Sequence, residues 1–370
     1  MILSKEQENA LNDIRGWFND PAKQQVYRLF GAAGTGKTSL AVFIANELGI
    51  SVAFATFTGK AALVMQKKGC WNASTIHSLI YVVVGEEKDG TPIFDLNPAS
   101  PIYSKDLIII DECSMVDEKL GKDLLSFEKP ILVLGDPEQL PPVKGAGFFT
   151  NHEPDFVLRE IHRQALDNPI IRLSRDVRNG IRLKKGNYDG KVEILDKRDF
   201  DVEDMLERMM KSDQLIVGMN KTRHVCNELV REKLGREDWK PVVGDRLVCL
   251  RNNRLKKLLN GGLWSVDTVK NINEYGVSLM LKSEDFEHNV YASVYSHPLF
   301  FEGKDDKMEW KFKKRFDEFN YGYALTTHKC QGSQWKDVTL FDESHVFRED
   351  ATKWLYTGIT RAEEKLTIFL

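Results

Sequence analysis

Residues 31–38 combine glycines with a lysine and a threonine at the spacing of a phosphate-binding loop. The segment Gly31-Ala32-Ala33-Gly34-Thr35-Gly36-Lys37-Thr38 satisfies the pattern G-x-x-x-x-G-K-[ST] at every fixed position. Glycines let backbone N–H groups wrap phosphate oxygens, and the start of a following helix adds positive potential. Lys37 would neutralise the β- and γ-phosphate oxygens, and Thr38 would supply a hydroxyl to Mg²⁺. The residues expected to bind a nucleotide here are Gly34, Thr35, Gly36, Lys37, Thr38 and Ser39.

Two carboxylates and a glutamine follow apolar runs further along the chain. Asp111 and Glu112 come directly after Leu107–Ile110, and Gln139 follows Ile131–Leu134. In an open α/β sheet, such strand ends meet at the edge where ligands bind. Asp111 would complete the Mg²⁺ shell, Glu112 would deprotonate an attacking water, and Gln139 would sense the γ-phosphate. These residues predict hydrolysis of a nucleoside triphosphate.

Strand-like and helix-like segments alternate around these residues. Apolar runs predict strands at 26–30, 51–55, 107–110 and 131–134, and helices are expected at 39–48 and 60–68. Continuous apolar strands separated by helices are typical of a parallel sheet that is covered on both faces. The sequence therefore predicts an α/β protein with two lobes, each interrupted by a β-rich insertion.

Turn residues and changes in pattern suggest where the segments meet. A first lobe is expected over 1–80 and 104–155, a β-hairpin over 81–103, a second lobe over 156–241 and 317–370, and a barrel-like β insertion over 242–316. The hairpin rests on the valine run after Tyr81 and on the turn Asp89-Gly90. The barrel-like insertion rests on short strand-like runs separated by pairs such as Gly261-Gly262.

The composition is that of a globular chain and excludes several classes of protein. The 370 residues carry 52 Lys+Arg against 55 Asp+Glu, a net charge of −3, which excludes a polybasic nucleic-acid binder but not a local basic groove. No apolar run approaches the length of a membrane span, and the first residues do not form a signal peptide. Five scattered cysteines without C-x-x-C spacing fit a reducing compartment. We therefore expect a cytoplasmic protein without a membrane partner.

Further segments resemble the motifs of the superfamily 1 helicases of the RecD-like group, in the order of that family. Beside the phosphate loop, Asp111-Glu112 and Gly135–Val143, they are Leu3–Gln7, Thr56–Ala62, Ser74–Leu79, Ile161–Gln164, Thr326–Ser333 and Leu355–Ala362. The resemblance implies two RecA-like P-loop NTPase lobes with parallel sheets, a hairpin insertion in the first and an SH3-like barrel in the second. It implies ATP and Mg²⁺ as cofactors. The small size resembles phage members, in which case the location would be the host cytoplasm.

The resemblance also assigns roles at the nucleotide. It implies that Gln7 reads the adenine and that Gly332 lies in the motif coupling DNA to ATP. Arg163 and Arg361 match the two arginine fingers of the family. Physical reasoning agrees, because arginine delivered from a second lobe stabilises the charge that spreads over the transferred phosphoryl group.

Polar, basic and aromatic residues of these segments predict a single-strand track. A cationic, hydroxyl-rich path suits the backbone of a single strand, and aromatic faces suit its bases. The predicted contacts are Thr58, Lys60, Thr75, His77, Thr327, His328, Lys329 and Ser333. Related helicases carry a duplex-splitting wedge where the hairpin lies, and Phe94 is a positional candidate for its tip.

The resulting hypothesis is an ATP-dependent DNA helicase that moves 5′ to 3′, a polarity that only the resemblance implies. Its partners would be single-stranded DNA and fork junctions, with a single-strand binding protein or replication proteins as further candidates. The chain is short for the family, which favours a minimal monomeric motor. Three alternatives stay open: a DNA-stimulated ATPase that remodels protein–DNA complexes, a P-loop kinase and a non-catalytic nucleic-acid clamp.

Overall fold

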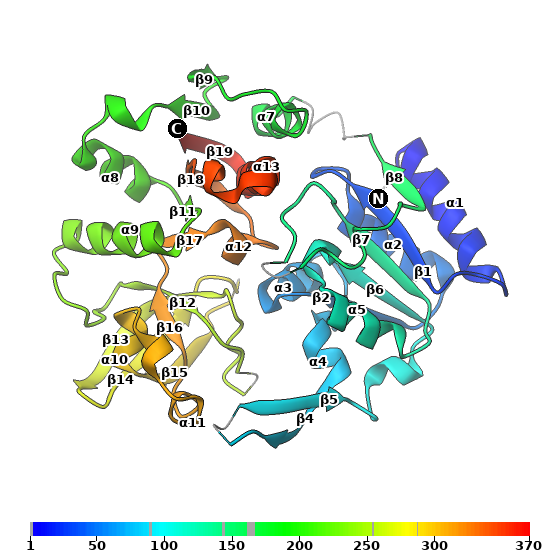
Figure 1. Ribbon diagram of the computed structural model, residues 1–370, viewed down its shortest axis with the longest axis horizontal. Coiled ribbons are helices and arrows are strands. Elements are labelled where there is room, and N and C mark those ends of the chain that lie inside the picture. The colour runs from blue at the N-terminus through cyan, green and yellow to red at the C-terminus, as the bar shows by residue number, and fades with distance from the viewer. Residues whose placement is uncertain (1–2, 89–90, 143–144, 161–166, 254, 287) are drawn as a thin grey trace.

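The computed structural model describes residues 3–88, 91–142, 145–160, 167–253, 255–286 and 288–370. Figure 1 shows two α/β lobes side by side, with a β-rich unit next to the second lobe and a hairpin that extends toward this unit from the first. Within the described ranges, no helix combines the length and the apolar character needed to cross a bilayer.

The first lobe is built on a six-stranded parallel sheet in the order β3-β2-β6-β7-β1-β8. Its strands are β1 (Val26–Gly31), β2 (Val52–Thr56), β3 (Ser74–Thr75), β6 (Leu107–Asp111), β7 (Ile131–Gly135) and β8 (Phe156–Leu158). Its helices are α1 (Lys5–Asn19), α2 (Lys37–Leu48), α3 (Gly59–Lys67), α4 (Ile76–Ile80) and α5 (Glu118–Leu125). Because β6, β7 and β1 are neighbours, their carboxyl ends bring the phosphate loop and the acidic pair to one edge.

Successive side chains of β6 pack against helices on opposite faces of this sheet. Leu107 and Ile109 share a buried cluster with residues of α1 and α2, whereas Ile108 and Ile110 share one with residues of α4 and α5. All four side chains are completely buried. The apolar run therefore marks a strand covered on both sides, as the sequence predicted.

The second lobe contains another six-stranded sheet, in the order β17-β11-β18-β19-β10-β9, in which only the β10–β9 pair is antiparallel. Its strands are β9 (Gly186–Tyr188), β10 (Val192–Leu195), β11 (Gln214–Val217), β17 (Ala324–Thr326), β18 (Trp335–Phe341) and β19 (Ala362–Phe369). Its helices are α7 (Pro169–Arg178), α8 (Val202–Lys211), α9 (Asn220–Lys233), α12 (Thr327–Cys330) and α13 (Ala351–Ile359). Buried clusters place α7 and α13 on one face and α8 and α9 on the other.

The β-rich unit, called the insertion below, is a five-stranded antiparallel sheet in the order β15-β14-β13-β12-β16. It consists of β12 (Arg246–Cys249), β13 (Leu263–Asn273), β14 (Gly276–Ser283), β15 (Tyr291–Ser296), β16 (Phe319–Tyr321), α10 (Pro298–Phe301) and α11 (Trp310–Lys313). Two register shifts interrupt the pairing of β13 with β14, and such irregularities bend and twist a strand. The separate hairpin of the first lobe pairs β4 (Tyr81–Glu86) with β5 (Pro92–Leu96).

Strand pairing corrects two of the expected segment boundaries. β8 pairs with β1, so Phe156–Leu158 belongs to the first lobe and not to the start of the second. β16 pairs with β12, so the insertion extends to Tyr321 and does not end at residue 316. Both strands have only three residues, a length at which an apolar pattern cannot distinguish a strand from a loop.

Candidate active site and nucleic-acid interface

The phosphate loop joins β1 to α2 through two left-handed glycines. Gly34 and Gly36 have φ angles of +84° and +80°, a region that residues with a Cβ rarely enter. Gly31 is required for space, because a Cβ there would lie 2.8 Å from Thr35 Oγ1 and 2.9 Å from Leu158 O. Glycine at these positions brings the loop over the first turn of α2, where backbone N–H groups favour an anion.

Lys37 and Thr38 open α2 and place an ammonium and a hydroxyl at the loop. Lys37 Nζ donates to the carbonyl oxygens of Gly31 at 2.5 Å and of Ala32 at 3.0 Å. Thr38 Oγ1 donates to Oδ2 of Asp111, the last residue of β6, at 2.6 Å. One carboxylate and one hydroxyl are hard oxygen ligands of the kind that Mg²⁺ uses together with substrate phosphates. Thr38 and Asp111 therefore fit a Mg²⁺ site.

Glu112 follows Asp111 in a strained backbone conformation. Its φ angle is +55°, and a non-glycine residue held in this region costs about 1–3 kcal/mol, a strain that clusters at functional sites. Desolvation raises the pKa of the Glu112 carboxyl, although Arg361 and Lys37 act in the opposite direction. A carboxylate with a raised pKa is a stronger base near neutral pH. Glu112 thus has the chemistry of a residue that takes a proton from water.

A cavity of about 420 Å³ collects residues of both lobes. It is lined by Lys37, Thr38, Asp111, Glu112 and Gln139 of the first lobe and by Gly332 and Arg361 of the second. The Gln139 side chain is buried, and its Oε1 has no hydrogen-bond partner within the described ranges. A buried acceptor normally finds a partner, so the unsatisfied Oε1 makes Gln139 a candidate for contact with a nucleotide bound in this cavity.

Arg361 is held at the wall of this cavity by its own lobe. Its Nε donates to Thr357 O at 2.9 Å, its Nη1 to Ser333 O at 3.2 Å and its Nη2 to Thr360 Oγ1 at 3.0 Å. The residue is 3% exposed, so contacts within its own lobe define the orientation of the guanidinium in this structure. The other predicted arginine finger, Arg163, lies outside the described residues.

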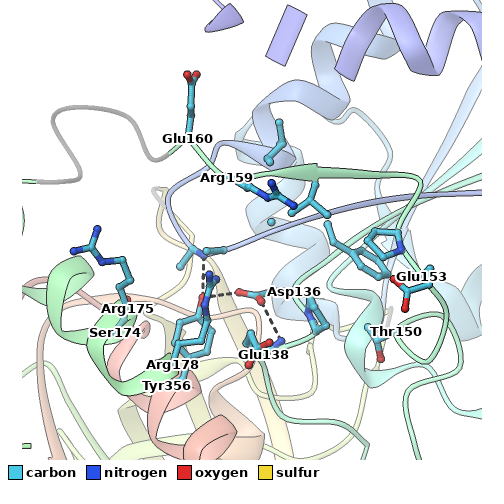
Figure 2. Close-up of a pocket in the computed structure, with 18 of the residues that line it drawn as sticks. Asp136, Glu138, Thr150, Glu153, Arg159, Glu160, Ser174, Arg175, Arg178 and Tyr356 are labelled. Atoms are coloured by element: carbon cyan, nitrogen blue, oxygen red, sulfur yellow. Dashed lines mark hydrogen bonds between the residues drawn. The ribbon is translucent and has the colours of Figure 1, made fainter. Parts of the chain in front are cut away.

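A larger cavity, of about 1060 Å³, also adjoins the phosphate loop, and Figure 2 shows the residues around it. Ser4 and Ala33 of the first lobe and Arg175, Arg178 and Tyr356 of the second belong to its lining. Ala33 lines this cavity and the smaller one. Both cavities therefore adjoin the phosphate loop and are lined by residues of both lobes.

Gln7 lies buried between α1 and the phosphate loop. Its Nε2 donates to Thr35 O at 3.0 Å, and its Oε1 accepts from Ser4 N at 3.0 Å. Ser4 and Gln7 form the capping box of α1. A side-chain amide has two N–H donors and an oxygen with two lone pairs, so these two bonds are compatible with reading an adenine edge. That role stays a prediction.

The predicted track residues of the first lobe lie on the starts of α3 and α4. Thr58 Oγ1 accepts from Ala61 N at 3.1 Å, and Thr75 Oγ1 accepts from Ser78 N at 3.2 Å. Both threonines are therefore N-caps. Both hydroxyls were predicted to contact DNA, and their capping bonds give each one a structural use as well.

Lys60 is paired with the insertion. Its Nζ lies 3.1 Å from Asp285 Oδ1 and 4.6 Å from the centroid of the Trp335 ring. The residue is 8% exposed, so its ammonium is enclosed by a carboxylate and an aromatic face. A DNA phosphate would have to replace Asp285 to reach it.

His77 and the wedge candidate Phe94 come together in an aromatic cluster. The His77 ring lies 4.9 Å from Tyr81 and 6.0 Å from Phe94, centroid to centroid. Burial and the charge of Lys119 lower the pKa of His77, so it is neutral near pH 7. Phe94 is 47% exposed. The cluster therefore offers ring faces rather than a cation at the base of the hairpin.

The second lobe corrects two predicted DNA contacts. Thr327 is completely buried and its hydroxyl donates to Val217 O at 3.3 Å, while Ser333 is 2% exposed. Neither side chain reaches a surface that a strand could contact: the Thr327 hydroxyl is turned to β11, and Ser333 is enclosed after the end of α12. His328 and Lys329 keep partial exposure, and burial lowers the pKa of each.

Five residues of the cleft and track escaped the sequence reasoning: Asp136, Asp285, Trp335, Tyr356 and Thr357. Asp136, Tyr356 and Thr357 lie inside segments that the resemblance marked, so their polar side chains beside the arginine finger were a usable signal. Asp285 and Trp335 contact Lys60 from distant parts of the chain, and no local pattern predicts such a pairing.

Comparisons with known proteins agree with this geometry. A family model described as an AAA domain matches residues 2–199, more than half of the chain, and one described as a UvrD-like helicase C-terminal domain matches residues 321–369. The ATP-dependent RecD2 DNA helicase of Deinococcus radiodurans is 27% identical over 390 residues, which cover 98% of this chain and 48% of that protein. The chain thus spans about half the length of this relative. The RecBCD enzyme subunit RecD of Buchnera aphidicola is 22% identical, over 92% of this chain and 69% of that protein.

Solved structures of Pif1 helicases share the fold. Pif1 in a study of DNA unwinding at forked double-stranded DNA superposes with a TM-score of 0.63 at 19% identity, over 100% of this chain and 92% of that one. Bacteroides Pif1 bound to single-stranded DNA gives 0.59 at 18% identity, over the same shares. These matches confirm the predicted fold class of two α/β lobes with parallel sheets. The chain belongs to the AAA-domain family, and its similarity to RecD2 and RecD supports the predicted resemblance to the RecD-like group of superfamily 1 helicases.

Proposed function

We propose that the chain hydrolyses ATP and uses the energy to move 5′ to 3′ along single-stranded DNA and to unwind duplex. The observation that carries the proposal is the 420 Å³ cavity, in which Lys37, Glu112 and Gln139 of one lobe face Arg361 of the other. Phosphoryl transfer to water needs positioning and charge neutralisation more than covalent chemistry. The residues of the cavity provide both, and they come from two lobes that can approach and separate.

Each residue has a defined task in this scheme. Glu112 accepts a proton from the water that attacks the γ-phosphorus, and Gln139 orients that water through its unpaired Oε1. Lys37 and Arg361 neutralise charge on the transferred group. Mg²⁺ held by Thr38 and Asp111 would neutralise the phosphate oxygens further. Hydrolysis then weakens the attraction between the lobes, and their opening is the mechanical step.

The hairpin supports unwinding rather than translocation alone. Val83, Val84 and Phe94 are 54%, 59% and 47% exposed on its two strands, an apolar surface that suits contact with unstacked bases. Glu86 at the end of β4 forms an ion pair with Lys314 of the insertion at 2.7 Å. The hairpin is therefore braced from the second lobe as well as from the first.

Two duplexes that differ only in a 5′ or a 3′ single-stranded tail test the proposal. With ATP and Mg²⁺, we expect strand separation on the 5′-tailed duplex alone, together with phosphate release. Phosphate release stimulated by single-stranded DNA but without strand separation would replace unwinding by remodelling of protein–DNA complexes. If no phosphate is released either with or without DNA, the proposal of an ATP-driven motor is wrong. Lys37→Ala is the control, since it removes the phosphate-binding ammonium and leaves the hairpin unchanged.

The same assay addresses the proposed partners and assembly. We propose that a monomer is sufficient, so the rate per chain should not depend on protein concentration. A single-strand binding protein would act by trapping the released strand, and its addition should raise the yield of unwinding more than the ATPase rate.

A further inference from the structure

The hydroxyl of Tyr356 joins the two lobes at the phosphate loop. Tyr356 belongs to α13 of the second lobe and is 1% exposed. Its Oη accepts from Ala33 N at 3.0 Å and donates to Asp136 Oδ2 at 2.5 Å. Figure 2 shows both bonds at the edge of the large cavity. Ala33 lies inside the phosphate loop, and Asp136 opens the segment that carries Gln139.

The direction of these bonds is fixed. Burial and the neighbouring charge of Asp136 raise the pKa of the Tyr356 phenol far above its usual range, so the hydroxyl stays protonated. It must then donate to the Asp136 carboxylate and can only accept from the Ala33 N–H. Asp136 Oδ1 in turn accepts from Glu138 N at 3.1 Å. One phenol thus orders the phosphate loop and the segment before Gln139 together.

The same helix turn holds the arginine of the small cavity. Thr357, the next residue, accepts from Leu140 N through its Oγ1 at 3.0 Å and from Arg361 Nε through its carbonyl oxygen at 2.9 Å. The segment from Asp136 to Leu140 is therefore attached to α13 at both of its ends. Gln139 lies between these two attachments, and Arg361 is hydrogen-bonded to the same turn of α13.

We infer that Tyr356 is a positioning residue that transmits the conformation of the phosphate loop to Arg361 and Gln139. The inference rests on the proposed ATPase. A triphosphate that reorders the loop moves the Ala33 N–H, and the Tyr356 bonds pass this movement to α13. The arginine then reaches its working position only when the loop is filled. In this scheme the Tyr356 hydroxyl contacts neither the attacking nor the leaving oxygen, because it donates to Asp136 and accepts from the Ala33 N–H.

Tyr356→Phe tests this role, since it keeps the packed ring and removes the hydroxyl. A hydrogen bond to a charged group contributes enough for its loss to lower kcat at saturating single-stranded DNA by about tenfold, with KM for ATP changed less than about twofold. Tyr27→Phe is the matched control. Tyr27 is also buried and also donates to a carboxylate, Asp13 Oδ2, at 2.5 Å, but it lines neither cavity. This control should keep the wild-type kcat.

A second comparison separates positioning from general destabilisation. In an Arg361→Ala background, Tyr356→Phe should cause a smaller loss in kcat than the tenfold loss in the wild-type background, because one of the two residues through which it acts is gone. An undiminished kcat in the single variant, or the same tenfold loss on both backgrounds, would overturn the inference. If Tyr356→Phe does not fold, as judged by a thermal melt, Asp136→Asn decides in its place and should lower kcat several-fold. Absence of ATP hydrolysis in the wild-type chain would instead remove the proposed function itself.

Discussion

The pairing of Lys60 with Asp285 predicts that the insertion competes with DNA for the first lobe. Asp285→Asn should strengthen binding of single-stranded DNA. The ammonium of Lys60 lies 3.1 Å from Asp285 Oδ1, and the two side chains are only 9% and 12% exposed. Lys67 Nζ also donates to Asp285 O at 2.9 Å, and Asp285 Oδ2 accepts from Leu263 N at 2.8 Å. Asparagine keeps the shape and an acceptor for Leu263, but it removes the charge.

The expected size follows from an exchange of partners. In the wild-type chain a phosphate can bind Lys60 only by displacing a carboxylate of like charge, which leaves little net gain. In the variant the phosphate gains a charge-assisted hydrogen bond of about 1.5–3 kcal/mol, or about 10- to 150-fold in Kd. One more neutralised phosphate should also steepen the dependence of log K on log salt by about 0.7.

Fluorescence anisotropy of a labelled oligothymidylate, titrated at several salt concentrations without nucleotide, measures both quantities. Asp267→Asn is the matched control, because Asp267 is an exposed residue of the same insertion and the substitution changes the net charge by the same unit. Equal gains from both substitutions would show a general charge effect. A gain that persists in a Lys60→Ala background would show that Asp285 does not act through Lys60.

Four further predictions concern the cleft and the track. Lys37→Ala should abolish ATP hydrolysis and leave single-strand affinity within about twofold, because the two sites are separate; turnover near the wild-type rate would exclude the loop as the ATP site. Glu112→Gln should bind ATP but lower kcat by at least about 10²-fold, and full activity would remove Glu112 as the base. Because the pKa of Glu112 is raised, its carboxylate is protonated at a higher pH than usual, so kcat should begin to fall above the usual carboxylate range as the pH decreases. The residual activity of the glutamine variant should not show this fall. Phe94→Ala should slow strand separation at least several-fold with unchanged DNA-stimulated phosphate release, whereas equal losses in both would argue against a wedge. Burial lowers the pKa of Lys329, which shows that its charge is costly to bury. Lys329→Met should therefore raise the free energy of unfolding by about 1 kcal/mol or more, and it should weaken DNA binding. A lower free energy of unfolding in a urea melt would contradict the predicted gain in stability.

Local sequence was sufficient where a motif and its flanking strand coincide. The phosphate loop, Asp111 at the end of β6 and the two-sided burial of that strand were all predicted, because each depends on neighbours along the chain. Boundaries failed at β8 and β16, whose three residues are strands only because a longer strand pairs with them. Tertiary pairing, rather than propensity, decides such elements.

Side-chain direction was the other part that the sequence could not provide. The resemblance marked Thr326–Ser333 as one motif, but it did not show that Thr327 turns inward to Val217 while Lys329 stays partly exposed. Likewise Lys60 was predicted to contact DNA, and the structure shows its ammonium paired with Asp285. A motif identifies the segment that approaches a ligand, whereas tertiary packing determines which of its side-chain atoms are exposed to that ligand.

The segment Gln331–Ser333 connects the nucleotide cleft to the predicted DNA track. Its first residue donates from Nε2 to Leu140 O at 2.9 Å, and its last accepts from Arg361 Nη1 at 3.2 Å. Between them, Gly332 has a φ of +74°, and a Cβ there would lie 2.6 Å from Ala61 Cβ on α3. Three consecutive residues therefore contact the segment that carries Gln139, the side chain of Arg361 and the helix that begins at the predicted DNA contacts. The two lobes are therefore in close contact at Gly332, and in the proposed mechanism a movement of Arg361 together with Ser333 would shift α3 relative to the second lobe.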